Sequence, residues 1–175
     1  MPSDTIALPD RAVVLLIGAA GSGKSTFAAR HFQADSIVSA DRLRGIVGPN
    51  ESSQQHNDEV FERIHQIVQE RAAAGLLTVI DATNTRGPAR SELGWHAHRH
   101  HRPLVAIVLD LPVKTCLEQN GRRPHPVPPR VVRQQVADLR HIESDLETEG
   151  YSLVHLVRSV QGLDQLRVTI GSGTE

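Results

Sequence analysis

The sequence is poor in cysteine and in aromatic residues, and each shortage excludes a class of protein. A single cysteine, Cys116, excludes an internal disulfide and fits a reducing compartment, so we expect a cytoplasmic protein. The first apolar run, Val13–Ile17, is too short to cross a bilayer, and the acidic start does not resemble a signal peptide. We therefore expect no membrane partner. One Trp, one Tyr and three Phe leave few platforms on which nucleobases can stack.

Charge is balanced over the whole chain but not along it. The formal net charge of −1 gives no global sign of a polyanionic partner. Residues 86–102 hold four arginines and four histidines against one acid, and residues 122–133 hold four arginines and one histidine with no acid. Both segments can contact phosphates. A solvated helix face explains the first segment equally well and the second one less well.

Short apolar runs alternate with helix-like segments, which predicts an α/β fold with a parallel sheet of four to five strands. The runs are continuous, as expected for strands that helices cover on both faces. The predicted strands are Val13–Ile17, Ser36–Ser39, Leu77–Ile80, Leu104–Leu109 and Leu153–Val157. With 175 residues, the chain is long enough for one domain, and we expect a core over about residues 11–170.

Helical periodicity is clearest over residues 54–74, where one apolar stripe is followed by Gly75. A second helix is predicted from Pro129 to near Gly150, with its apolar side formed by Val132, Val136, Leu139 and Leu146. A weaker pattern predicts a helix between Ala89 and His101. Cys116 is expected in the core.

The segment GAAGSGKS at residues 18–25 matches the phosphate-binding pattern G-x-x-x-x-G-K-[ST]. It lies between an apolar strand and a helix-compatible segment, so loop amides and a helix N-terminus can surround a polyphosphate. Lys24 can reach the β- and γ-phosphates, and Ser25 can hold Mg²⁺. The sequence therefore predicts a P-loop NTPase kinase fold that binds a nucleoside triphosphate. The candidate contacts are Gly18, Gly21, Ser22, Gly23, Lys24, Ser25 and Thr26.

Two aspartates follow predicted strands, at the edge of the sheet where ligands bind. Asp41 is placed to accept a proton from an attacking hydroxyl, or to cap a helix over Arg42–Val47, and the two roles are compatible. Asp81 ends an apolar strand in the manner of a Walker B aspartate, which lies near Mg²⁺ through water. Its alternative interpretation is the start of a turn.

The proline-rich residues 120–129 predict a loop, and we expect a helical lid over about residues 119–139. Arg122 and Arg123 lie in this loop, where an arginine can cover the charge that develops between the β- and γ-phosphates. A solvent-facing pair beside a turn is the alternative. His96 and His100 are spaced for one helix face, which permits a metal site, but a polar helix end is the preferred interpretation.

The motifs follow one another in an order that points to a family: residues 18–26, then Ser39-Ala40-Asp41-Arg42-Leu43-Arg44-Gly45, Asp81-Ala82-Thr83-Asn84, Leu109-Asp110-Leu111-Pro112, and Arg123 before Val127-Pro128. Over about residues 13–157 this resembles the 5′-OH polynucleotide kinase family. It is most similar to the kinase domain of the bacterial end-healing RNA repair polynucleotide kinase-phosphatase. The motifs around Asp41 and Asp81 are more specific than the phosphate-binding loop.

The resemblance implies transfer of the ATP γ-phosphate, with Mg²⁺, to the 5′-OH end of RNA or DNA. By position, Asp41 matches the general base and Arg44 the contact with the terminal phosphodiester of the acceptor. Lys24 and Ser25 match the donor-phosphate and metal contacts, and Arg123 matches a lid arginine. Family members often carry arginine before the lid asparagine, where this chain has Gln119. Arg122 is a candidate substitute.

Two other functions remain open. A small-molecule kinase acting on a sugar, nucleoside or antibiotic hydroxyl shares the phosphate-binding loop and an aspartate base. A nucleotide-gated module without catalysis is the other alternative. Arg44 and the basic segments favour a polynucleotide, because such an acceptor offers phosphates beyond its hydroxyl. The sequence does not fix the oligomeric state or distinguish RNA from DNA.

Overall fold

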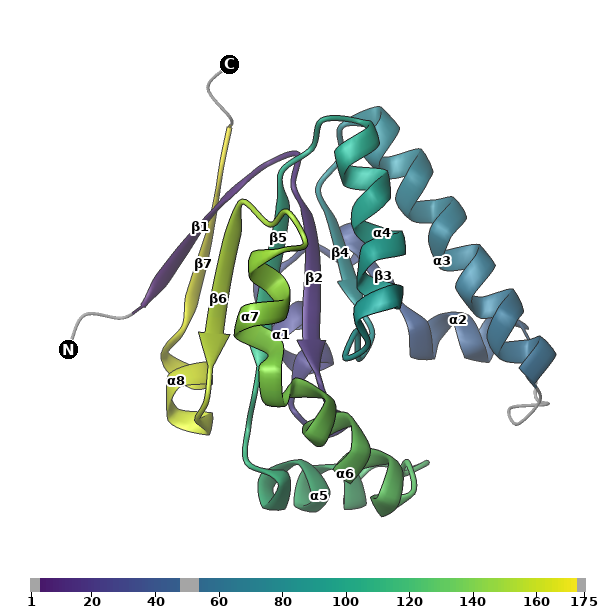
Figure 1. Cartoon of the computed structure of the whole chain (residues 1–175), viewed down its shortest axis with the longest axis vertical. Helices are drawn as coiled ribbons and strands as arrows, with labels where there is room; N and C mark the ends of the chain where they lie inside the picture. The colour runs from purple at the N-terminus through teal and green to yellow at the C-terminus, as the bar shows by residue number, and fades with distance from the viewer. Residues whose placement is uncertain (1–3, 48–53, 173–175) are drawn as a thin grey trace.

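The computed structural model of the chain describes residues 4–47 and 54–172, and it contains a five-stranded parallel sheet in the order β3-β4-β2-β5-β6 (Figure 1). The predicted α/β fold with a parallel sheet is confirmed, and the bounds of each predicted strand agree with the structure within one residue. The strands are β2 (Val13–Gly18), β3 (Ile37–Ser39), β4 (Thr78–Asp81), β5 (Leu104–Leu109) and β6 (Leu153–Val157).

The helices between these strands follow the expected α/β alternation. The helices before β5 are α1 (Lys24–His31), α2 (Ala40–Val47), α3 (Gln54–Ala74) and α4 (Gly87–Arg99), with a 3₁₀ turn over Ala34–Ser36. After β5 come α5 (Val113–Gly121), α6 (Pro129–Asp138), a 3₁₀ turn over Leu139–His141, α7 (Ile142–Glu147) and α8 (Val160–Gln165).

Strand β2 is buried on both faces, which explains its unbroken apolar sequence. Val14 and Leu16 point to one core cluster, together with Phe27 of α1 and Val132 of α6. Val13, Leu15 and Ile17 belong to the other cluster, beneath α3 and α4. The sheet is therefore the middle layer of the molecule, and its central strand leads directly into the phosphate-binding loop.

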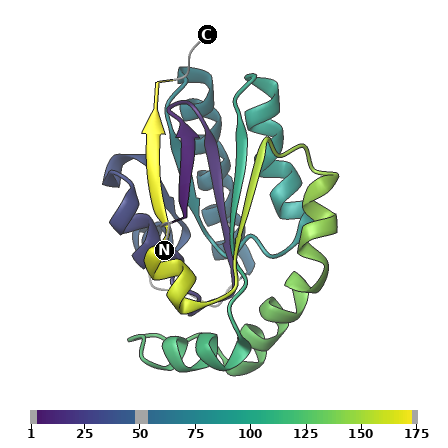
Figure 2. The same cartoon turned by 90° about the vertical axis from the view of Figure 1, so that its left-hand side faces the viewer.

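A second, two-stranded parallel sheet was not predicted. It pairs β1 (Thr5–Pro9) with β7 (Arg167–Gly171), so the first and last strands of the described chain lie side by side (Figure 2). In β1, only Ile6 and Leu8 are buried in the core. Because one face of this pair is open to solvent, buried and exposed residues alternate in β1, and neither strand has an apolar run as long as those of β2 and β5.

The single helix predicted from Pro129 to near Gly150 is wrong: the structure divides it into α6, a 3₁₀ turn and α7. Val132 packs in the same core cluster as α1, whereas Leu139, Ile142 and Leu146 pack in the cluster beneath α3 and α4. One straight helix cannot face both clusters, so the chain turns at Leu139–His141.

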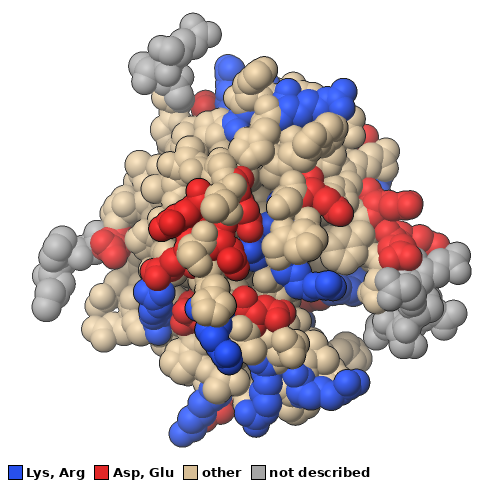
Figure 3. Space-filling model, viewed as in Figure 1, with Lys and Arg blue, Asp and Glu red and all other residues tan. Residues whose placement is uncertain are grey.

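Helices α5 and α6 lie beyond the sheet, on the side to which the arrowheads of β2 and β6 point (Figure 1). This is the edge where ligands bind in open α/β sheets. In the same view, Lys and Arg side chains gather over this end of the molecule (Figure 3). Among the described residues, none of the helices has both the length and the apolar character needed to cross a membrane.

Candidate functional site

The phosphate-binding loop connects β2 to α1 in a conformation that requires glycine. Gly21 and Gly23 have φ values of 81° and 92°, in the left-handed region. A Cβ on Gly21 would also overlap the carbonyl oxygen of Cys116, on α5. At Gly18, an added Cβ would lie 2.6 Å from the Ser22 hydroxyl. The loop is therefore held closely against both the end of the sheet and the helix beyond it.

Lys24, the first residue of α1, folds back over this loop. Its Nζ donates to the carbonyl oxygen of Ala19 at 2.8 Å and to the hydroxyl of Ser22 at 3.4 Å. Burial lowers the pKa of Lys24 to about 8, although Asp81 and Asp41 act in the opposite direction. The ammonium group is thus partly desolvated, which strengthens its attraction to an incoming phosphate.

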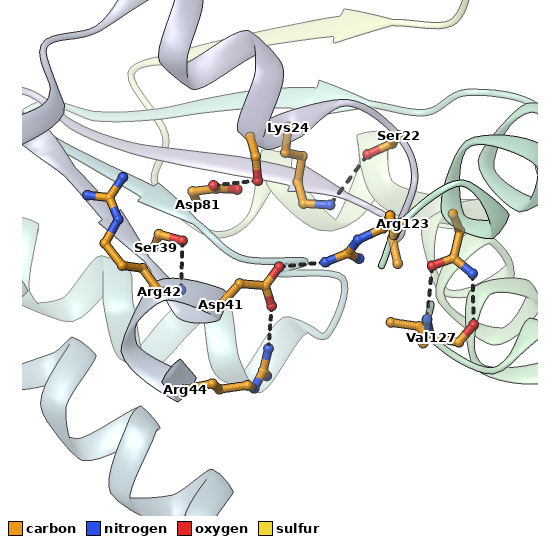
Figure 4. Close-up of polar contacts among 12 residues, drawn as sticks. Ser22, Lys24, Ser39, Asp41, Arg42, Arg44, Asp81, Arg123 and Val127 are labelled. Atoms are coloured by element: carbon orange, nitrogen blue, oxygen red, sulfur yellow. Dashed lines mark hydrogen bonds and ion pairs between the residues drawn. The ribbon is translucent and has the colours of Figure 1, made fainter. Parts of the chain in front are cut away.

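Asp81 ends strand β4 beside the loop, as the sequence predicted. Its Oδ2 accepts a hydrogen bond from the Ser25 hydroxyl at 2.8 Å (Figure 4). Burial raises the pKa of Asp81, and the bond from Ser25 and the charge of Lys24 partly oppose this shift.

A hydroxyl and a carboxylate side by side are oxygen donors of the kind that Mg²⁺ prefers, and phosphates and water complete its coordination. Ser25 and Asp81 therefore fit a magnesium site. Over residues 4–47 and 54–172, no group of three or more His, Cys, Asp or Glu side chains is arranged to hold a metal ion.

Asp41 lies in the first turn of α2, between two arginines. Its Oδ1 accepts from Arg44 Nη1 at 2.9 Å, and its Oδ2 accepts from Arg123 Nη2 at 2.7 Å (Figure 4). Arg44 lies one turn further along α2, whereas Arg123 comes from the segment between α5 and α6. The structure therefore brings together three residues that the sequence predicted for the site, two of them 82 positions apart.

The structure assigns the helix cap to a different residue from Asp41. Helix α2 begins at Ala40, and the hydroxyl of Ser39 accepts from the backbone N–H of Arg42 at 3.3 Å. Because Ser39 provides the capping oxygen, the carboxylate of Asp41 is free to project toward Arg123. Its side chain is 56% exposed, so a substrate can reach it.

The segment that carries Arg123 is closed by a side-chain amide. Asn120 is 2% exposed; its Nδ2 donates to the carbonyl of Val127 at 2.7 Å, and its Oδ1 accepts from the Val127 N–H at 3.1 Å. These two bonds join the end of α5 to the start of α6 and fix the intervening residues. Arg123 is thereby directed onto Asp41, whereas Arg122 is exposed.

Residues 86–102, the first of the two basic segments, use several of their basic side chains for contacts within the protein. Arg90 of α4 is 1% exposed and forms a bidentate ion pair with Glu149, at 2.8 and 2.9 Å. Arg102 donates to the carbonyl of Ala72 at the end of α3. His96 lies 2.9 Å from His65 of α3, ring nitrogen to ring nitrogen. These contacts account for Arg90, Arg102 and His96 without a phosphate, whereas Arg86 and Arg99 are exposed.

Sequence reasoning assigned no role to the residues that hold the phosphate-binding loop in place, although Asn84 belongs to the motif that begins at Asp81. Asn84 has a φ of 50°, and its side chain donates to the carbonyl of Leu16 in β2. Thr83 accepts from the N–H of Gly18, so the segment after β4 is bonded to the start of the phosphate-binding loop. Arg90 then donates to the carbonyls of Asn84 and Thr85. The sequence contained a signal for Asn84, which tolerates the left-handed region, but none for Arg90.

Comparison with solved structures gives relatives with the same fold. A chain of the Pnkp1/Rnl/Hen1 RNA repair complex aligns with a TM-score of 0.67 and 22% identity, covering 79% of this chain and 46% of that one. A sugar kinase from Janibacter sp. HTCC2649 aligns with a TM-score of 0.59 and 21% identity, covering 86% of each chain. A gluconokinase from Sinorhizobium meliloti 1021 aligns with a TM-score of 0.55 and 18% identity, covering 90% of this chain and 87% of that one.

The present chain thus spans less than half of the RNA repair protein and most of the other two. No curated protein matches the sequence significantly. The family model of the AAA domain matches residues 13–142. Because this match runs from β2 through α6 and covers more than half of the sequence, the chain belongs to the AAA domain family, and its fold is that of the P-loop kinases.

Proposed function

We propose that the chain is a 5′-hydroxyl polynucleotide kinase, which transfers the γ-phosphate of ATP to the 5′-OH end of RNA or DNA. One observation carries the proposal: Asp41 lies between Arg44 and Arg123, beside the loop that receives the triphosphate. A carboxylate next to the terminal phosphate is suited to accept the proton of an attacking hydroxyl. The fold similarity to a chain of an RNA repair complex supports a nucleic-acid substrate.

Each residue has a role that follows from its position. Lys24 and the loop amides hold the donor phosphates, and Mg²⁺ at Ser25 and Asp81 would neutralise part of their charge. Asp41 accepts the proton of the hydroxyl. Arg44 orients the acceptor through its first phosphodiester, and an arginine suits this contact because its planar group can bind two phosphate oxygens at once.

Arg123 changes partner during the reaction. In the structure, its guanidinium is paired with Asp41 Oδ2. A bound triphosphate offers a stronger anion at the adjacent loop, and an arginine bound to phosphate both covers the leaving charge and leaves the carboxylate oxygen free for the hydroxyl. Positioning and electrostatics thus supply the rate, as is general for phosphoryl transfer.

A small-molecule kinase is the second candidate, because the sugar kinase and the gluconokinase match this chain over nearly their full lengths. The two candidates differ in what Arg44 binds. A polynucleotide brings a phosphodiester to it, whereas a sugar brings hydroxyl groups.

The test is an incubation of the protein with ATP labelled at the γ-phosphate and Mg²⁺. The acceptors are 5′-OH RNA, 5′-OH DNA, the same oligonucleotides with a 5′-phosphate as matched controls, and gluconate, simple sugars and nucleosides. We expect label on the 5′-OH oligonucleotides alone. Label on a sugar or nucleoside alone would replace the proposal with the second candidate. ATP binding with no labelled acceptor would favour a module without catalysis.

A further inference from the structure

The lid helix α6 is tied to the phosphate-binding loop by one side chain that the proposed chemistry does not use. Gln135 Oε1 accepts a hydrogen bond from the backbone N–H of Ala20 at 2.9 Å, across 115 positions of sequence. Ala20 is 5% exposed, and a buried backbone N–H without a partner costs stability. The amide of Gln135 is thus the protein partner of a loop donor that water reaches poorly.

The position of Gln135 on α6 is unusual for a polar residue. It lies on the inward face, one turn after Val132, which is buried, and next to Val136, which packs on the same core cluster. Apolar residues are expected at this spacing on the inner side of an amphipathic helix. The bond to Ala20 explains why a polar side chain occupies the position.

Helices α5 and α6 contact the phosphate-binding loop at two adjacent residues, Gly21 and Ala20. Helix α5 approaches Gly21 so closely that its Cys116 carbonyl would overlap an added Cβ, and α6 is bonded to Ala20 next to it. The pair of bonds between Asn120 and Val127 then closes the segment between the two helices. The orientation of that segment relative to the loop is therefore set at two points, one of them the side chain of Gln135.

We propose that Gln135 is a positioning residue for phosphoryl transfer. Its bond to Ala20 holds α6, and with it Arg123, in register over the donor phosphates. This inference rests on the proposed kinase function. The residue touches neither substrate nor Asp41; it acts by holding the lid arginine at the distance from the loop that transfer requires.

The structure supplies a matched control in the preceding residue. Gln134 is exposed, and its Nε2 donates to Asp138 within α6 itself. A change at Gln134 therefore alters one helix-surface contact and leaves the contact between α6 and the loop intact. The variants are Gln135→Ala, Gln135→Glu, which keeps an acceptor oxygen, and Gln134→Ala.

The first measurement does not depend on any acceptor. Amide hydrogen exchange of Ala20 and the guanidinium signals of Arg123 are followed by NMR in each variant. We expect Ala20 exchange to accelerate in Gln135→Ala by about threefold to tenfold, the equivalent of one neutral hydrogen bond, and the Arg123 signals to change. Protection of Ala20 should persist in Gln135→Glu and in Gln134→Ala. Unchanged Ala20 protection or unchanged Arg123 signals in Gln135→Ala would overturn the proposal.

The second measurement separates binding from transfer. We expect Gln135→Ala to bind ATP within about twofold of the wild type, because Lys24 and the loop are intact, and to lower kcat by about threefold to tenfold. A higher KM for ATP at unchanged kcat would contradict a positioning role. Urea unfolding of each variant checks that the fold is retained. If the wild type labels no acceptor, the proposed function fails, while the Ala20 and Arg123 signals still decide whether Gln135 positions the lid.

Discussion

Removal of the buried guanidinium of Arg90 should destabilise the whole domain, because two separate segments meet on it. The side chain is 1% exposed and makes four hydrogen bonds: two to Glu149, and one each to the carbonyls of Asn84 and Thr85. Burial opposes its charge, but the hydrogen bonds and the charge of Glu149 outweigh burial and raise the pKa of Arg90. Arg90 is therefore charged throughout the range in which the protein is handled.

The size of the destabilisation follows from the groups that lose their partner when Arg90 is replaced. The Glu149 side chain is 12% exposed, and in Arg90→Met its carboxylate loses the guanidinium that it pairs with. The carbonyls of Asn84 and Thr85 lose their hydrogen-bond donor as well. Breaking a buried ion pair from one side costs about 3–5 kcal/mol, so we expect a loss of about 4 kcal/mol in the free energy of unfolding. That is a large part of the roughly 5–15 kcal/mol typical of a domain.

Double-mutant analysis by urea unfolding tests this reasoning. The double variant Arg90→Met with Glu149→Leu should lose less than the two single variants added together, because no charge is then left unpaired. Arg99→Met is the matched control on the same helix: Arg99 is exposed and stacks 5.0 Å from the ring centre of Trp95, which is worth at most about 1 kcal/mol. A loss below about 1 kcal/mol in Arg90→Met, or additive losses in the double variant, would refute the role of the pair.

Three further predictions concern the site itself. Gly21→Ala places a Cβ in the left-handed region and against the Cys116 carbonyl, so calorimetry should give at least tenfold weaker ATP binding; wild-type affinity would contradict this. Burial holds the pKa of Lys24 at about 8 against 10.5, so between these values the unfolded chain binds more protons from this group and the free energy of unfolding should increase with pH. Between pH 7.5 and 9.5, urea unfolding should show a smaller increase in the free energy of unfolding for Lys24→Met than for the wild type. An equal increase in the two proteins would exclude this lysine as the cause. Arg44→Ala should raise the KM for a 5′-OH oligonucleotide about tenfold and leave the Kd for ATP unchanged. The control variant Arg42→Ala should alter neither constant. An equal rise in KM in the two variants would contradict the contact assigned to Arg44.

The main sheet was predictable because its strands are covered on both faces. Continuous apolar runs such as Val13–Ile17 can bury themselves in few other ways, and the phosphate-binding motif fixed where β2 ends. The pair β1–β7 has one open face, so neither strand carries a long apolar run. Its two strands also lie at opposite ends of the chain. The break between α6 and α7 depends on which core cluster each turn of helix meets, and helical periodicity carries no such information.

The candidate site was predictable where a residue follows a strand or belongs to a motif. Lys24, Asp41 and Asp81 are of this kind, because the carboxyl ends of parallel strands converge. The supporting residues are not, because their partners are backbone groups far away in the chain. Gln135 bonds to the N–H of Ala20, and Arg90 bonds to the carbonyls of Asn84 and Thr85. Only three-dimensional proximity identifies such pairs.

The central claim is that the carboxylate of Asp41 accepts the proton of a 5′-hydroxyl. Single-turnover transfer from labelled ATP to a 5′-OH oligonucleotide should be compared for the wild type, Asp41→Asn and Asp35→Asn. Asp35 is an exposed aspartate at the opposite end of β3 and serves as the control. We predict that Asp41→Asn binds ATP normally and transfers phosphate at least about 100-fold more slowly, while Asp35→Asn is unchanged. Transfer by Asp41→Asn at the wild-type rate would contradict the account.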